Sequence, residues 1–313
     1  MSEYNLKERM GDWGPYGNNE GEWLIFSVGN PYEGHGLALP KAIDDFHAKK
    51  AAFDLELKTG QKYVAHIPYT TDRCGPVAKD WAPYYIPWEA FYQKTVNFMK
   101  YYVDIFRNRG ESASKVMLIT GHGGNGIILE RHYQREICQK LELSKFIAIT
   151  ALISRKDVNR VLEELKKLSE SIINKKIFPY GLKDPENLKD FYIKVLMSAG
   201  HASHVEHSLA AAMGLCDLEK VGIMNAMLEK NFEGALKKWP AIGGLGGYLL
   251  AGGRYTEALG TQDNDKYGLW NCLAGLRDLN GGKLIVEPEL GHIIHKISLE
   301  TKSELISRNM DNP

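Results

Sequence analysis

The chain has 313 residues, of which 44% are hydrophobic and 25% charged, a composition typical of a globular protein with one large α/β domain or two small ones. Lysine plus arginine equals aspartate plus glutamate at 39 each, and no long block of one sign occurs, so we expect no nucleic-acid partner. No apolar run approaches the roughly 18 to 20 residues that span a bilayer, so we expect no membrane partner either.

The first half of the chain alternates predicted strands and helices. Four segments have the apolar composition of buried strands: 22–31, 62–70, 116–120 and 145–154. Helical spacing lies between them, over residues 40–60, from about 88 to 107, and from 127 onward. This alternation predicts an α/β fold, a three-layer α/β/α sandwich with a mostly parallel sheet.

The pattern is less regular after residue 154. In chain order we expect a charged helix (155–176), an insertion (178–195), a glycine-rich stretch (243–253), a polar loop (255–267), the strand KLIVEP (283–288) and a helix from about Gly291. No repeat or linker divides the chain. We therefore predict one domain over residues 1–313, with insertions near 70–87 and 155–198.

The motif GHGGNG (121–126) follows a predicted strand and precedes a predicted helix. Its glycines at 121, 123 and 126 satisfy the G-x-G-x-x-G fingerprint of dinucleotide-binding loops. Such a loop needs an acidic residue about 20 positions later, and KFIAITALIS contains none. The imidazole of His122 could instead bind a metal. A metal loop is therefore favoured, while a non-catalytic nucleotide-binding module stays the alternative.

Two other segments are rich in side chains that bind metals. The first, NPYEGHGLALPKAIDDFH (30–47), follows a predicted strand, and the second is GHASHVEHS (200–208). Their candidate ligands are Glu33, His35, Asp44, Asp45, His47, His201, His204, Glu206 and His207. Carboxylates and imidazoles bind zinc, manganese and iron. Because active sites of α/β folds form at the carboxyl edge of the sheet, we expect these clusters to meet there with His122.

Simpler explanations exist for several of these residues. An Asp pair near a helix start usually caps the helix. A single histidine is usually solvated or hydrogen-bonded, which is our interpretation of His47 and of four histidines outside these segments: His66, His132, His292 and His295. Hydrogen bonding is likewise the alternative role for the three histidines of residues 200–208.

Three motifs give the chain a resemblance to the creatininase family of metal-dependent amidohydrolases. The family pattern E-x-H-G-x-x-L-P, with an Asp eleven residues after the Glu, stands here as EGHGLALPKAID (33–44). The family's G-H-G-G-N stands as GHGGN (121–125), and H-A-G-x-x-E-T-S is matched more loosely by HASHVEHS (201–208). These motifs span most of residues 22–215.

The resemblance implies a centre of two divalent metal ions, zinc or manganese, with iron as the other candidate. The implied ligands are Glu33, His35, Asp44, His122 and Glu206. Asp44 would bridge the two ions, with Glu33 and His122 on the first ion. His35 and Glu206 would complete the second.

The implied reaction is hydrolysis of a small polar ring that contains a carbonyl group. Two ions activate a bridging hydroxide and polarise the carbonyl, while His201 would transfer a proton as the catalytic residue. Family members act on cyclic amides and related rings. The substrate is therefore expected to be a cyclic amide, cleaved at C–N, or an oxidised inositol such as 3-dehydro-scyllo-inosose, a cyclic diketone cleaved at C–C.

Departures from the family pattern argue against creatinine itself. Creatinine-cleaving members have an aromatic residue and a Glu after the loop histidine, where this chain has Gly123 and Gly124. They also have an acid where this chain has Gly200. The long loop 70–87 would bring polar and aromatic groups to the site, unless it is only a solvated surface loop: Asp72, Arg73, Lys79, Trp81, Tyr84 and Tyr85.

Two further expectations concern the protein's surroundings. The four cysteines are far apart, without a C-x-x-C pair, and MSEYNLKERMGDWG lacks the apolar core of a signal peptide, which predicts reduced thiols and a cytoplasmic location. The resemblance implies a homo-oligomer, with a hexamer as the expected form. A metal-dependent isomerase or lyase that acts on a sugar-like substrate is the enzymatic alternative to this hydrolase.

Overall fold

The computed structural model describes ten ranges of the chain: residues 21–35, 38–73, 75–80, 82–153, 157–174, 188, 190–192, 195–196, 203–230 and 284–309. They belong to two compact units. The first unit contains residues up to 32, 42–152 and 298 onward, and the second contains 33–41 and 153–297. The predicted stretches at 243–253 and 255–267, and most of the insertion at 178–195, lie outside the described ranges.

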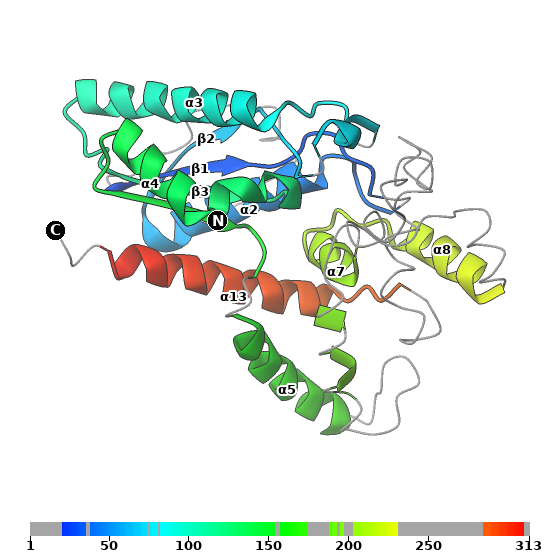
Figure 1. The fold of residues 1–313 in the computed structure, drawn as a ribbon. Helices are drawn as coiled ribbons and strands as arrows, with labels where there is room; N and C mark the ends of the chain where they lie inside the picture. Colours follow the sequence, from blue (N-terminus) through cyan, green and yellow to red (C-terminus); the bar gives the residue numbers. More distant parts are fainter. Residues whose placement is uncertain are drawn as a thin grey trace. The chain divides into compact units, whose positions relative to one another are not determined.

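A four-stranded parallel sheet forms the centre of the first unit (Figure 1). The strands run in the order β2-β1-β3-β4 and are β1 (Trp23–Val28), β2 (Lys62–Ile67), β3 (Lys115–Thr120) and β4 (Lys145–Thr150). All six residues of β1 and all six of β2 are buried. Strands covered on both faces have nearly continuous apolar sequences, which is why β1 was predictable.

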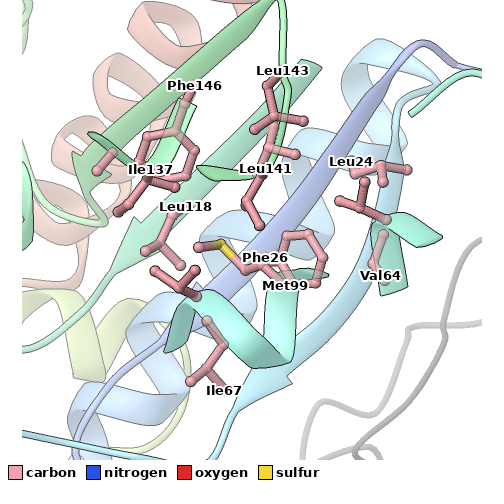
Figure 2. Packing of buried hydrophobic residues seen from close by; sticks show 14 of the residues in the cluster. Leu24, Phe26, Val64, Ile67, Met99, Leu118, Ile137, Leu141, Leu143 and Phe146 are labelled. Carbon is pink, nitrogen blue, oxygen red and sulfur yellow. The ribbon is translucent and has the colours of Figure 1, made fainter. Parts of the chain in front are cut away.

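One face of the sheet is covered by α3 (Trp88–Asn108) and α4 (Arg131–Lys140). Figure 2 shows this core, in which Leu24 and Phe26 of β1 pack with Met99 of α3 and Ile137 of α4. Side chains of a strand alternate between faces, so every second residue of β1 belongs to this core. The burial of this layer contributes to stability through the hydrophobic effect.

The opposite face is covered by α2 (Ile43–Thr59) and by the last part of α13 (Pro288–Ser307). Here Trp23 and Ile25 of β1 pack with Leu55 of α2 and Ile306 of α13. Helix α2 ends at Gly60, whose φ of 69° suits glycine, and its N–H donates to the Glu56 carbonyl oxygen. The predicted three-layer α/β/α arrangement with a parallel sheet is confirmed in this unit.

The segment after β3 differs from the prediction. A helix was expected from Ile127, but residues Gly123–Leu129 form a 3₁₀ helix (η2), and α4 begins only at Arg131. The contacts that hold this segment come from distant parts of the chain, because the buried side chain of Asn125 is hydrogen-bonded to the loops after β1 and β2. The loop 70–87 also contains a short 3₁₀ helix, η1 (Gly75–Asp80).

All the regular structure in the described part of the second unit is helical. It contains α5 (Val158–Asn174), α7 (His204–Ala212), α8 (Leu218–Lys230) and the start of α13. Helix α5 confirms the charged helix predicted at 155–176. The single-domain organisation, with its insertions, stays a prediction.

The prediction of a strand at KLIVEP is wrong for residues 284–287, which adopt no regular structure. The backbone N–H groups of two of these residues form hydrogen bonds with side chains and not with a neighbouring strand. Leu284 N–H donates to Asn225 Oδ1 at 2.6 Å, and Ile285 N–H donates to His204 Nδ1 at 2.8 Å. Helix α13 starts at Pro288, three residues before the predicted start, because proline is favoured in the first helical turn.

Among the described residues, no helix is long and apolar enough to cross a bilayer.

Candidate metal centre

Three loops of the first unit are joined by one side chain at the carboxyl edge of the sheet. Asn125, which is fully buried, donates through Nδ2 to the carbonyl oxygen of Gly29, after β1, at 2.9 Å. Its Oδ1 accepts from Thr71 N–H at 2.9 Å and lies 3.3 Å from Thr70 Oγ1, after β2. Asn125 itself follows β3, so the ends of three strands are tied together.

Glycines in two of these loops allow α2 to approach the strand ends. A Cβ atom on Gly29 would lie 2.5 Å from the backbone nitrogen of Asp45, and one on Gly121 would overlap the carbonyl oxygen of Asp44. The Gly121 N–H donates to Val28 O at 2.9 Å. This close approach explains Gly121 by packing against the protein's own helix, so the glycine needs no nucleotide to explain it.

Asp44 and His122 are brought into direct contact. His122 Nδ1 lies 2.8 Å from Asp44 Oδ2, and both side chains are buried. An ionised carboxylate can only accept, so the ring donates through Nδ1. The other nitrogen, Nε2, is then the atom that can bind a metal. A carboxylate on one histidine nitrogen with a metal on the other is a common arrangement in metalloproteins.

Asp72 lies on the other side of the same ring. Its Oδ2 is 3.5 Å from His122 Nε2, and the side chain is 8% exposed. Two carboxylates therefore flank one buried imidazole at the carboxyl edge. Burying such charge is costly unless a cation compensates it, so the donor set of this unit fits a divalent metal.

Asp45, the neighbour of Asp44, contacts a different histidine. His66 Nε2 lies 3.1 Å from Asp45 Oδ1, while His66 Nδ1 is 2.7 Å from Ser27 Oγ. Ser27 Oγ in turn lies 2.6 Å from Tyr63 Oη. Burial lowers the pKa of His66 despite the nearby Asp45. The order Asp–His–Ser is that of a hydrolytic triad, but Ser27 is fully buried within β1, so we assign the network a structural role.

Two predicted ligands, Glu33 and His35, lie on the segment 33–41 of the second unit. Both are buried, and Glu33 N–H donates to Lys41 O at 2.9 Å. His35 Nδ1 lies 3.0 Å from the Glu33 carbonyl oxygen. A carbonyl only accepts, so Nδ1 carries the proton and Nε2 is the nitrogen that could bind a metal.

The remaining candidates lie on or near α7. Glu206 is buried in its first turn, after the N-cap residue Ser203, whose hydroxyl accepts from Glu206 N–H at 3.5 Å. His207 Nδ1 lies 3.0 Å from Ser203 O, and His204 Nδ1 accepts from the Ile285 N–H. Burial lowers the pKa of His204 to about 4. His204 and His207 therefore both have backbone partners. The predicted catalytic residue His201 lies outside the described residues.

The structure thus brings together two of the five predicted ligands, Asp44 and His122. The other three, Glu33, His35 and Glu206, belong to the second unit, and their meeting with the first pair stays a prediction. Asp72 was not among the predicted ligands. It follows the predicted strand at 62–70, the same signal that singled out the other two clusters.

Comparisons with known proteins gave results only at the level of structure. No protein-family model matches the sequence, and no curated protein matches it. Over 94% of its length the chain is similar to 93% of a creatininase mutant, with 13% identity and a TM-score of 0.46. It is also similar to a creatinine amidohydrolase (13% identity, 93% and 91% covered, TM-score 0.45) and to a structure named Creatininase Mn (14%, 94% and 93%, 0.45).

Proposed function

We propose that the protein is a metal-dependent hydrolase. The observation that carries this proposal is the buried contact between Asp44 and His122 at the carboxyl edge of the sheet, with His122 Nε2 pointing away from Asp44. The contact fixes which ring nitrogen can bind a metal. The proposed ligands are Glu33, His35, Asp44, His122 and Glu206, and the proposed ions are zinc or manganese, with iron as the other candidate.

The protein's own residues would prepare the site for hydrolysis. Asp44 orients the His122 ring through one carboxylate oxygen, Oδ2, and so holds Nε2 as the nitrogen available to a metal. The bound divalent metal supplies Lewis acidity, which activates water and polarises a carbonyl group. His201 is the proposed proton donor to the leaving group.

The proposed substrate is a small polar ring that carries a carbonyl group, and its opening is the proposed outcome. A cyclic amide would be cleaved at C–N and a cyclic diketone such as 3-dehydro-scyllo-inosose at C–C. In the loop 70–87, Arg73 Nη2 donates to Gly126 O at 2.7 Å, which anchors the loop to η2. Tyr84 is 62% exposed and packs edge-on against Tyr32. Such aromatic and hydroxyl groups suit a ring with several polar substituents.

A two-stage experiment tests the proposal. Elemental analysis of protein purified without added metal should find tightly bound zinc, manganese or iron, whereas a nucleotide-binding module would contain none. A screen over cyclic amides and cyclic ketones, run in ¹⁸O-labelled water, should then find a product that has gained the label. Turnover without label would favour an isomerase or lyase. Mass measurement in solution tests the proposed homo-oligomer.

A further inference from the structure

Gly124 and Asp72 share one small space beside His122. A Cβ atom on Gly124 would overlap His122 Nε2 and would lie 2.9 Å from both Cα and Cγ of Asp72. Any other residue at position 124 would therefore displace the His122 ring, Asp72 or both. Glycine here leaves the ring nitrogen facing a carboxylate that comes from a different loop, the one after β2.

The separation between Asp72 and His122 is informative. Asp72 Oδ2 and His122 Nε2 are 3.5 Å apart, longer than the 2.8 Å hydrogen bond on the other side of the ring. Two donors of a tetrahedral ion, each about 2.1 Å from the metal, would be about 3.4 Å apart. The two atoms are thus spaced as ligands of one ion would be.

Both neighbours of Asp72 are anchored to η2, Thr71 through its backbone and Arg73 through its side chain. Thr71 N–H donates to Asn125 Oδ1, and Arg73 donates to the carbonyl oxygen of Gly126. The Asp72 carbonyl oxygen accepts from Gly75 N–H at 3.0 Å. Both anchors belong to the 3₁₀ helix that follows His122, so the carboxylate and the imidazole are held by the same short element. Ligands held in this way lose little entropy when an ion binds.

We propose that Asp72 is a ligand of the ion that His122 binds, supplied by the loop after β2. This inference rests on the proposed metal-dependent function and adds a sixth ligand to its set. Asp72 and Asp44 then have different roles at the same histidine. Asp44 contacts Nδ1 and sets the protonation of the ring, whereas Asp72 completes the coordination on the Nε2 side.

Metal binding, measured without any substrate, tests this assignment. Chelated protein is titrated with Mn²⁺, and free Mn²⁺ is followed by electron paramagnetic resonance, for the wild type and for Asp72→Asn, Asp72→Ala and His122→Ala. The matched control is Asp104→Asn, because Asp104 is an exposed carboxylate on α3 paired with Lys100 at 2.9 Å. Circular dichroism and thermal unfolding establish that each variant is folded.

Loss of an outer partner of a ligand costs roughly 10- to 100-fold in metal affinity. Loss of a ligand should cost more, so we expect both Asp72 variants to bind Mn²⁺ at a site weakened by more than about 100-fold. The Co²⁺ forms should also differ from wild type in their visible absorption, which responds to coordination. Gly124→Ala should weaken binding without removing a charge, because the new Cβ would occupy the space between His122 Nε2 and Asp72.

The possible failures separate the two proposals. If the wild type binds neither Mn²⁺ nor Zn²⁺, the proposed function itself is wrong, and this inference fails with it. If the wild type binds Mn²⁺ and His122→Ala loses it, but Asp72→Ala binds as tightly as Asp104→Asn, only the assignment of Asp72 is overturned.

Discussion

Asp44 and Asp45 are neighbours in the first turn of α2, yet their carboxylates contact different histidines. Asp44 Oδ2 lies 2.8 Å from His122, at the carboxyl edge of the sheet, whereas Asp45 Oδ1 lies 3.1 Å from His66, within β2. Neither caps the helix, whose N-cap residue is Ala42. The two carboxylates are similarly buried, but each has a different histidine as its partner.

Substituting each acid in turn should separate the roles of the two. Asp44→Ala should lose bound metal and activity, because a proposed ligand and the partner of His122 disappear together. Asp45→Ala should keep its metal while losing stability, since it removes the partner of the buried His66. Metal content by elemental analysis and urea unfolding provide the two measurements. Metal loss in Asp45→Ala with retention in Asp44→Ala would contradict the assignment.

The glycine loop offers a matched pair of variants. Gly121→Ala should destabilise the protein by roughly 1 to 3 kcal/mol, because its Cβ would overlap the carbonyl oxygen of Asp44. Gly123→Ala should change the free energy of unfolding by less than about 0.5 kcal/mol, since no atom lies within 4 Å of its Cβ position. Urea unfolding of the chelated proteins measures both. Equal destabilisation would rule out close packing of α2 as the reason for Gly121.

Acid should destabilise the first unit through His66. Burial lowers its pKa from 6.5 in the folded state, so between the two pKa values the unfolded chain binds more protons. Stability is therefore fully present above about pH 6.5 and falls as the pH is lowered, by at most about 1.4 kcal/mol per pH unit for this one group. His66→Gln should be less stable at pH 7.5 but less sensitive to acid. Urea titrations at several pH values measure both effects.

The control for the His66 prediction is His132→Gln, which changes an exposed histidine on α4. It should unfold with the pH dependence of the wild type. An unchanged acid dependence in His66→Gln would show that other groups are responsible.

His201 carries the prediction about catalysis. As a general acid or base it should contribute about 10²- to 10⁴-fold to the rate, so His201→Ala should lower turnover by that amount with its metals retained. The pH–rate profile should also lose one limb. Retained activity would exclude the role, and loss of metal would make His201 a ligand.

The sequence was most informative where one physical requirement dominates. Strand β1 and helix α2 were predictable because a strand covered on both faces is nearly continuously apolar and Gly60 ends the helix. Residues 284–287 have the same apolar composition as a strand. They were mispredicted because Asn225 and His204, which are remote in sequence, take their backbone hydrogen bonds.

The candidate site was predictable in part for a related reason. His122 and the acids at 44 and 45 stand out as polar groups next to strand ends. The proximity of Asp72 to His122 depends on the path of the loop after β2, which Asn125 and Gly126 fix through side-chain and carbonyl contacts. The spacing of residues within one segment of the sequence cannot reveal that Asp72 lies near His122.

The bonds of Asn125 also bear on when the site forms during folding. They join residues that are 96 and 54 positions apart in the chain, so each requires a parallel crossover to have closed first. Contacts of such long sequence separation form slowly, since the entropy of loop closure must be lost beforehand. The Thr71 amide hydrogen should therefore become protected from exchange only when β1, β2 and β3 are already aligned. The geometry around His122 is thus a product of the finished sheet, and partly folded chains do not contain it.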